Sequence, residues 1–325
     1  MSQPQLPRRE LLMNTTAALG AAALGAAALV GGPTTASAAA PNRPADEPFG
    51  YCLNTSTIRE QKIGIVAELE LAAKTGYHAV EPWIRELDEY AAAGNSLKDL
   101  GKRISDLGLT IESAIGFPEW IVDDDARRKA GLEEAKRCMD IMAQIGGKRI
   151  AAPPVGAQKV TGMNLFAAAD RYRALLELSD QTGVIAEVEV WGHSQTLGRL
   201  GEAVFVAVES GHPKACLLPD VYHIFKGGSD FNGLKLINGA AIPVFHLNDY
   251  PATPSRAEQT DADRVYPGDG VAPLKQIFTD LYAAGFRGYF SLELFNRTYW
   301  QQPADVVVRT GLEKMRAAVR AAFAS

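Results

Sequence analysis

The chain has 325 residues, of which 47% are hydrophobic, 22% charged and 8% aromatic, and its formal net charge is −5 at pH 7. This composition excludes an intrinsically disordered protein, a collagen-like fibre and a small disulfide-stapled domain. The acidic balance offers no basic face for nucleic acid, so we expect no nucleic-acid partner. Cys52, Cys138 and Cys216 are an odd number of widely spaced thiols, which predicts buried free cysteines rather than a disulfide framework or a zinc site.

The N-terminal segment has the pattern of an export signal. Arg8 and Arg9 precede an uncharged stretch in which Ala17–Val30 consists of alanine, glycine, leucine and valine. Ala36-Ser37-Ala38 then supplies the small residues that a signal peptidase cleaves after. The pattern resembles a twin-arginine (Tat) signal peptide.

We therefore expect a cleavable signal peptide at residues 1–38, a short linker at residues 39–48 and the Tat export machinery as a partner. The protein would then be periplasmic or otherwise exported. A retained membrane anchor is the alternative, but alanine and glycine contribute little transfer energy to a bilayer, so no stable anchor is expected.

The remaining chain repeats one unit, in which a helical pattern ends, a glycine follows and an apolar strand begins. Leu132–Ile145 and Leu274–Tyr282 are examples of the helical pattern. The glycines that open the units are Gly76, Gly108, Gly146, Gly183, Gly211, Gly239 and Gly285. Glycine suits the left-handed position that follows a helix, because a Cβ atom would be strained there. The strands are continuous apolar runs, as in parallel sheets covered on both faces, and a further strand fits Phe49–Leu53.

Eight strands that alternate with helices predict an α/β fold, specifically a (β/α)8 TIM barrel that forms a single domain over residues 49–325. An open doubly wound sheet is the alternative. The absence of a GxGxxG motif after the first strand counts against a dinucleotide-binding sheet of that kind.

Each of the last four predicted strands ends in a residue that is costly to bury, namely Glu189, Asp220, His246 and Glu293 in turn. Barrel enzymes carry their chemistry at this end of the strands. One such residue is more often a helix cap or an ion-pair partner. Four at equivalent places indicate a divalent metal, since one cation would offset both desolvation and carboxylate repulsion. Glu187 competes with Glu189, because side chains two apart on a strand face the same way.

Five stretches carry a family resemblance. They are Glu189-Val190-Trp191-Gly192-His193, Asp220-Val221-Tyr222-His223, His246-Leu247-Asn248-Asp249, Asp263-Arg264-Val265-Tyr266-Pro267-Gly268-Asp269-Gly270 and Ser291-Leu292-Glu293-Leu294. Together they resemble the xylose isomerase-like TIM barrel superfamily, in its sugar phosphate isomerase/epimerase group of inosose isomerases and ketose 3-epimerases. The resemblance covers the whole chain after the signal segment and favours Glu189 over Glu187.

The resemblance implies one divalent metal held by Glu189, Asp220, His246 and Glu293. Manganese is the expected ion, with magnesium, cobalt or zinc as alternatives. It also implies that Glu189 and Glu293 are the catalytic pair, one removing a proton beside the substrate carbonyl and the other returning one. His223 and Arg264 would orient substrate oxygens.

Other candidates for substrate binding come from the strand ends themselves. Glu81 ends the second strand and Trp83 follows it, where Trp83 could stack on a sugar face. The alternatives are a salt bridge for Glu81 and core packing for Trp83. His193 would either reach the substrate or cap a helix. The four tryptophans, which we expect near the mouth of the barrel and which suggest a pyranose-sized ligand, are Trp83, Trp120, Trp191 and Trp300.

Three functions remain open at this point. The first is a metal-dependent isomerase or epimerase that converts a free sugar or polyol ketone, a small-molecule carbohydrate, through an enediolate. The second is a lyase or dehydratase that acts on a keto-inositol or 3-keto-glycoside by β-elimination. The third is a non-catalytic periplasmic sugar-binding protein. The sequence is also compatible with a homo-oligomer.

Overall fold

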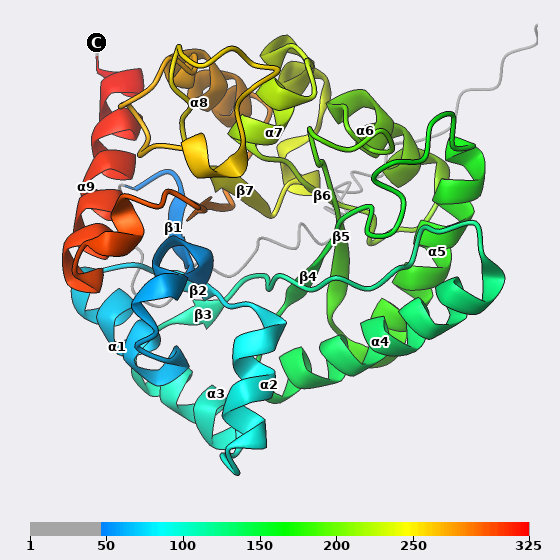
Figure 1. Cartoon of the computed structure of the whole chain (residues 1–325), viewed down its shortest axis with the longest axis horizontal. Helices are drawn as coiled ribbons and strands as arrows, with labels where there is room; N and C mark the ends of the chain where they lie inside the picture. The colour runs from blue at the N-terminus through cyan, green and yellow to red at the C-terminus, as the bar shows by residue number, and fades with distance from the viewer. Residues whose placement is uncertain (1–46, 325) are drawn as a thin grey trace, which may run out of the picture. The chain divides into compact units, whose positions relative to one another are not determined.

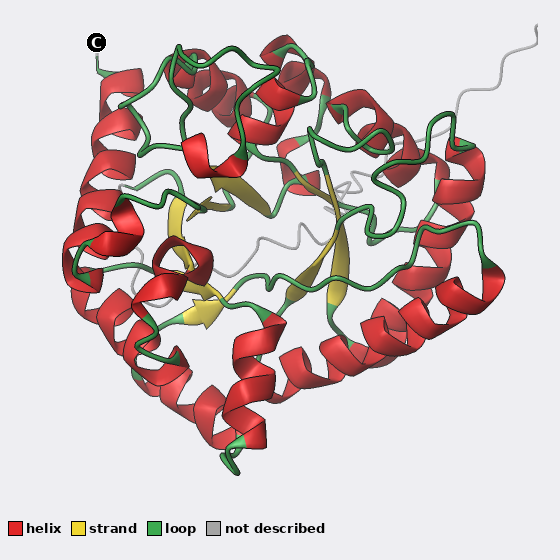
Figure 2. Ribbon diagram, viewed as in Figure 1, coloured by secondary structure: helices red, strands yellow, loops and turns green. Residues whose placement is uncertain are grey.

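Eight short parallel strands form the centre of the barrel, and helices surround them (Figures 1 and 2). The computed structural model describes residues 47–324, so the predicted signal peptide and most of the predicted linker lie outside the described residues. The strands are β1 (Gly50–Asn54), β2 (Ala79–Glu81), β3 (Thr110–Ile111), β4 (Arg149–Ala152), β5 (Ile185–Glu189), β6 (Leu217–Leu218), β7 (Val244–Leu247) and β8 (Tyr289–Leu292).

The helices lie between and after these strands. They are α1 (Ile65–Thr75), α2 (Ile84–Ala92), α3 (Leu97–Asp106), α4 (Asp125–Gln144), α5 (Leu165–Thr182), α6 (Leu200–Glu209), α7 (Val221–Lys226), α8 (Leu274–Ala283) and α9 (Ala304–Phe323). Short 3-10 helices add η1 (Thr55–Gln61), η2 (Phe231–Leu236), η3 (Gly239–Ala241), η4 (Asp261–Asp263) and η5 (Tyr299–Gln301). No helix within residues 47–324 has the length and apolar character needed to cross a bilayer.

The strands pair as two parallel sheets, in the orders β3-β2-β1-β8-β7 and β4-β5-β6. Two seams close them into a barrel. At the β3–β4 seam, the amide of Lys148 donates to the carbonyl of Ile111 at 3.1 Å. At the β6–β7 seam, Asp220 and His246 form a parallel bridge, and the amide of His246 donates to the carbonyl of Pro219 at 2.9 Å. The predicted barrel is confirmed, and the open sheet is excluded.

Most of the unit glycines have the backbone conformation that the sequence predicts. Gly76, for example, adopts φ +98° after α1, and Gly183 adopts φ +78° after α5. Gly239 differs, because its φ is not positive and it opens η3 rather than following an α-helix. A Cβ atom on Gly239 would lie 1.9 Å from the amide nitrogen of Phe286. Close backbone contact, not left-handed geometry, therefore requires glycine at this position.

The barrel core contains the three cysteines as buried free thiols, as the sequence predicts. Burial is the main reason why the pKa of each thiol lies above its ordinary value. Trp120 is also fully buried and donates its indole N–H to the carbonyl of Pro153 at 2.8 Å. Trp120 follows β3 on the C-terminal side of the strands, but its ring is enclosed by protein and offers no face to a ligand.

Candidate metal and sugar site

A cavity of about 500 Å³ is lined by residues at or beyond the C-terminal ends of the strands. The lining residues that the sequence predicts for the site are Trp83, Glu189, His193, His223, Arg264 and Glu293. Two further tryptophans, Trp191 and Trp300, line it as expected. The fold thus gathers residues that lie more than 200 positions apart in the chain.

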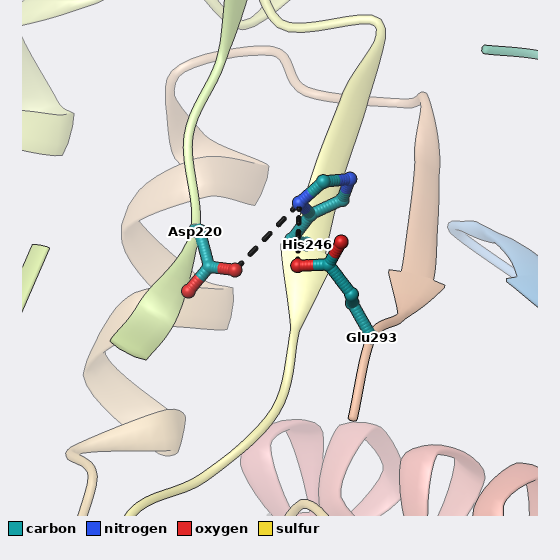
Figure 3. A group of neighbouring side chains, drawn as sticks. All are labelled: Asp220, His246 and Glu293. Atoms are coloured by element: carbon teal, nitrogen blue, oxygen red, sulfur yellow. Dashed lines mark ion pairs between the residues drawn. The ribbon is translucent and has the colours of Figure 1, made fainter. Parts of the chain in front are cut away.

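The four predicted metal ligands converge at the floor of this cavity. Glu189 ends β5, Asp220 follows β6, His246 lies in β7 and Glu293 follows β8, and all four side chains are buried. Nδ1 of His246 lies 3.2 Å from Oε2 of Glu293, 3.6 Å from Oδ2 of Asp220 and 4.0 Å from Oε1 of Glu189. Figure 3 shows the carboxylates of Asp220 and Glu293 directed at the imidazole.

The second ring nitrogen of His246 is held by Glu81. Nε2 lies 3.0 Å from Oε2 of Glu81, which also accepts hydrogen bonds from Oγ of Ser291 at 2.6 Å and Nδ2 of Asn54 at 2.9 Å. Burial opposes ionisation of Glu81, but His246 and these hydrogen bonds hold its pKa below the ordinary value. Burial opposes a charge on His246, but Glu293, Glu81 and Asp220 hold its pKa well above the ordinary value. With a metal ion bound, the imidazole would keep its proton on Nε2 toward Glu81 and present the lone pair of Nδ1 to the ion.

Glu81 has its predicted place at the end of β2, but it makes a salt bridge, which was the alternative to binding substrate. It is fully buried behind His246 and does not line the cavity. We therefore assign Glu81 to positioning the histidine in place of contacting substrate.

Arg264 brings a cation to the carboxylates. Its Nη1 lies 2.9 Å from Oδ2 of Asp220 and 2.8 Å from Oε2 of Glu293, and its Nη2 lies 2.5 Å from Oδ1 of Asp261. Burial would raise the pKa of Asp220, but Arg264 and His223 hold it well below its usual range. The guanidinium is itself buried, so it is strongly committed to these anionic partners.

His223 lies beside Arg264 at the edge of the floor. Its Nε2 is 3.0 Å from Nη2 of Arg264, and its Nδ1 accepts a hydrogen bond from the amide of Gly192. Burial and the neighbouring guanidinium lower the pKa of His223 to about 3, so its ring is neutral at physiological pH. The ring of His193 lies beside it, with 5.5 Å between the ring centroids and an angle of 56° between the ring planes. Both imidazoles face the space above the carboxylates.

The segment that delivers Arg264 is tied to β7 by Asp249. One carboxylate oxygen accepts the amides of Tyr250 and Ala272, and the other accepts those of Gly268 and Gly270. A Cβ atom on Gly270 would lie 2.3 Å from this carboxylate. The predicted Pro-Gly-Asp-Gly stretch therefore supplies amides and close approach to an anchor, which in turn places Arg264.

The donor set fits a divalent metal ion. Nδ1 of His246 and Oε2 of Glu189 are buried and have no hydrogen-bond partner among residues 47–324. Polar atoms buried in this way are costly unless something satisfies them. Ligand atoms of Asp220, His246 and Glu293 all lie within 4.8 Å of one another. Three hard carboxylate donors and one borderline imidazole nitrogen suit Mn²⁺, Mg²⁺, Co²⁺ or Zn²⁺.

Sequence reasoning missed several residues of the site. Asn54 ends β1, is fully buried and donates to both Glu81 and Glu293 while accepting the indole N–H of Trp83 at 3.0 Å. The same search for polar residues at strand ends would have found it. Arg59 and Phe295 also line the cavity, but no motif or spacing marks them.

Comparison with protein families gives a match over residues 69–318 to the model described as xylose isomerase-like TIM barrel. The crystal structure of IolI protein with a bound zinc atom superposes with a TM-score of 0.78 at 23% identity, and covers 85% of this chain and 100% of that one.

Two curated relatives match most of this chain. An inosose isomerase of Bacillus velezensis is 28% identical over 84% of this chain and 98% of its own length. A 3-dehydroshikimate dehydratase of Pseudomonas putida is 24% identical over 76% of this chain and 39% of its own length.

Proposed function

Because the chain belongs to the xylose isomerase-like TIM barrel family, we propose that it is a metal-dependent isomerase or epimerase of a free sugar or polyol ketone. The observation that carries the proposal is the approach of Glu189 and Glu293 from different sheets to one imidazole, at 4.0 and 3.2 Å. Two carboxylates placed across a reacting carbon can remove a proton on one side and return one on the other. The relatives named inosose isomerase support the same chemistry.

The metal is proposed to be Mn²⁺, held by Glu189, Asp220, His246 and Glu293. When bound, such an ion polarises a substrate carbonyl and stabilises negative charge that develops on oxygen. Elemental analysis of the protein purified after cytoplasmic folding tests this. About one equivalent of Mn is expected, with loss in Glu189→Ala and His246→Ala. Detection of Mg, Co or Zn would assign a different ion to the site. A parent protein that contains no metal and also fails to bind added Mn²⁺ would contradict the proposed site.

The protein residues supply the proton transfer and the orientation of the sugar. One of Glu189 and Glu293 takes the proton beside the carbonyl to give the enediolate, and the other protonates it. Arg264 and the neutral ring of His223 lie where they can hold sugar oxygens. Trp83 offers an aromatic face to the sugar ring.

Turnover of candidate ketoses and keto-inositols by the Mn²⁺-loaded enzyme tests the activity. Glu293→Gln is expected to lose about 10²–10⁴-fold in kcat while retaining sugar affinity. Glu112→Gln is the matched control, because Glu112 is a buried carboxylate near the end of β3 that pairs with Lys148 and Arg149 outside the cavity. A Glu293→Gln enzyme with full activity would contradict the assignment.

A lyase is the second candidate, supported by the relatives named 3-dehydroshikimate dehydratase. The same enediolate expels a group from the neighbouring carbon if one is placed to leave. The mass of the product separates the two reactions: it equals that of the substrate after isomerisation or epimerisation, and falls by water or an alcohol after elimination.

We also propose that residues 1–38 direct export through the Tat route, so that the enzyme folds and binds its metal before it leaves the cytoplasm. Replacement of Arg8 and Arg9 by lysine is expected to hold the protein in the cytoplasmic fraction. Unchanged fractionation would contradict this. Sedimentation of the mature chain will decide between a monomer and a homo-oligomer.

A further inference from the structure

The cavity is larger than one sugar ring needs. Glu189, Glu293, Arg264 and His223 surround the floor, but the same cavity extends to residues after β1 and β8. A volume of about 500 Å³ falls within the roughly 300–1,000 Å³ that commonly accommodates drug-sized ligands. The space beyond the reacting ring therefore has room for a further group.

That outer space is built around Arg59, which lies in η1 and lines the cavity. Its guanidinium carbon is 4.6 Å from the ring centroid of Trp300, 5.3 Å from that of Phe295 and 5.6 Å from that of Trp83. Cation–π attraction to these three rings holds the guanidinium in place. These rings accept no conventional hydrogen bond, so the guanidinium N–H groups remain able to donate to a ligand.

The charge of Arg59 is poorly matched by the protein. Its Nε is buried without a hydrogen-bond partner among residues 47–324. The carboxylate of Glu60 is 3.6 Å away, and Glu60 is 46% exposed, so this pair contributes little. Burial lowers the pKa of Arg59 and outweighs the opposing effect of Glu60, yet a guanidinium remains charged in a protein. Arg297, also exposed at the mouth, adds a second cation with no ion-pair partner in the described chain.

The acids of the cavity have other partners. Glu189 and Glu293 belong to the proposed metal site, and Asp261 pairs with Arg264. An otherwise acidic chain thus presents unmatched guanidinium groups beside an aromatic wall. A carboxylate on the ligand would supply the missing partner, because guanidinium binds carboxylate through two parallel hydrogen bonds.

On these grounds, and resting on the proposed sugar isomerase or epimerase function, we propose that the substrate is an acidic keto-sugar whose carboxylate binds Arg59 beyond the reacting ring carbons. The carboxylate belongs either to the sugar itself, as in a uronic acid, or to a group attached through its glycosidic oxygen. Trp83, Phe295 and Trp300 would flank the carbon skeleton that carries the carboxylate.

The decisive kinetic experiment compares a methyl 3-keto-glucuronide with the matching methyl 3-keto-glucoside, using the Mn²⁺-loaded full chain. The acid is expected to show a kcat/KM about tenfold or more above the neutral sugar. Arg59→Met is expected to abolish that ratio, mainly through KM, and Arg59→Lys to restore part of it. If Arg59 has only a structural role, Arg59→Met would lower kcat/KM equally for both substrates and leave their ratio unchanged. That result would overturn the proposal.

Arg85→Met is the matched control. Arg85 lies 5.6 Å from the ring of Trp83, as Arg59 does, but it is exposed on α2 and does not line the cavity. The ratio of the two substrates is expected to stay at the parental value in this variant. If the ratio falls as far as it does in Arg59→Met, the preference arises from positive charge on the surface in general and not from Arg59. That result would overturn the proposal.

Binding separates failure of this subsite from failure of the proposed activity. Calorimetry with non-reacting methyl glucuronide and methyl glucoside needs no turnover, and tighter binding of the acid is expected even if neither keto-sugar reacts. The pair 4-carboxyphenyl glucoside and phenyl glucoside distinguishes an acid on the attached group from an acid on the sugar. Equal binding within both pairs would overturn the proposal while leaving the isomerase function standing.

Discussion

Glu81 and His246 form a fully buried pair in which the carboxylate lies 3.0 Å from Nε2 of the imidazole. This contact sets which ring nitrogen is available to the other carboxylates. Because Nδ1 is the atom that faces Asp220 and Glu293, an acid outside the cavity would set the orientation of the histidine toward the proposed metal ion.

Glu81→Gln should weaken metal binding by about 10–100-fold, because an amide can present its N–H₂ group to Nε2 and favour the wrong tautomer. Titration of the metal-free protein with Mn²⁺, followed by electron paramagnetic resonance, measures the affinity directly. Glu47→Gln is the control, since Glu47 faces Nε2 of His78 at 3.4 Å at the opposite end of the strands. Parental affinity in Glu81→Gln would show that Glu81 does not position His246.

Arg264→Met should have opposite effects on metal binding and on the stability of the metal-free protein. Arg264 touches Asp220 and Glu293, so its removal leaves buried carboxylates unpaired and is expected to cost about 3–5 kcal/mol of stability without metal. Removal of a competing cation should also tighten Mn²⁺ binding by about tenfold or more. Thermal unfolding with and without Mn²⁺ measures both effects. Weaker binding together with an unchanged midpoint would contradict the prediction.

Asp249→Asn should lower both stability and turnover. The carboxylate accepts four backbone amides, including those of Gly268 and Gly270, and the asparagine N–H₂ group would face donors instead, at a cost of about 1–3 kcal/mol for each unpaired amide. Turnover should fall as Arg264 loses its position. Asp269→Asn is the control, because Asp269 lies in the same segment but pairs with Lys314 at the surface. Equal effects in the two variants would rule out a specific anchor.

Glu68 predicts a pH dependence of stability that is separate from the site. This carboxyl is 2% exposed in α1, and burial, with Glu86 nearby, raises its pKa from 4.5 to about 8. Between these two pKa values the folded chain holds a proton that the unfolded chain has released, so this group's contribution to stability falls as pH rises. The slope for one such proton is about 1.4 kcal/mol for each pH unit.

Glu68→Gln should therefore be more stable than the parent at pH 8, with a much smaller difference at pH 5. Denaturant unfolding at several pH values between these limits measures the slope. Glu70→Gln, an exposed neighbour on the same helix, should leave the slope unchanged. A parental slope in Glu68→Gln would contradict the prediction.

The sequence predicts the barrel and most of the site because both depend on local order along the chain. A polar residue at the end of an apolar run, as at Glu189 or His246, marks the catalytic end of a strand wherever the strands close. The structure confirms all eight strands at the expected places, since glycine and apolar runs delimit each one.

What the sequence cannot predict depends on contacts between distant segments. Arg59 becomes a candidate for ligand binding only through its contacts with Phe295 and Trp300, which lie more than 200 residues further along the chain. Glu81 has the predicted strand-end position, but only the closed barrel shows that His246 and Ser291 surround its carboxylate. Gly239 fits the repeat by pattern while serving close contact with Phe286.

The bridge between Asp220 and His246 has a mechanical consequence. Two of the proposed ligands belong to the β4-β5-β6 sheet and its end, and two to the sheet that contains β7 and β8, so the proposed metal site spans the β6–β7 seam. An ion held there would link the two sheets across the β6–β7 seam. Its loss would weaken the pairing at this seam before the rest of the barrel unfolds. Protection of the His246 amide against hydrogen exchange should consequently track metal occupancy, which makes the integrity of the wall a direct gauge of how much enzyme is loaded.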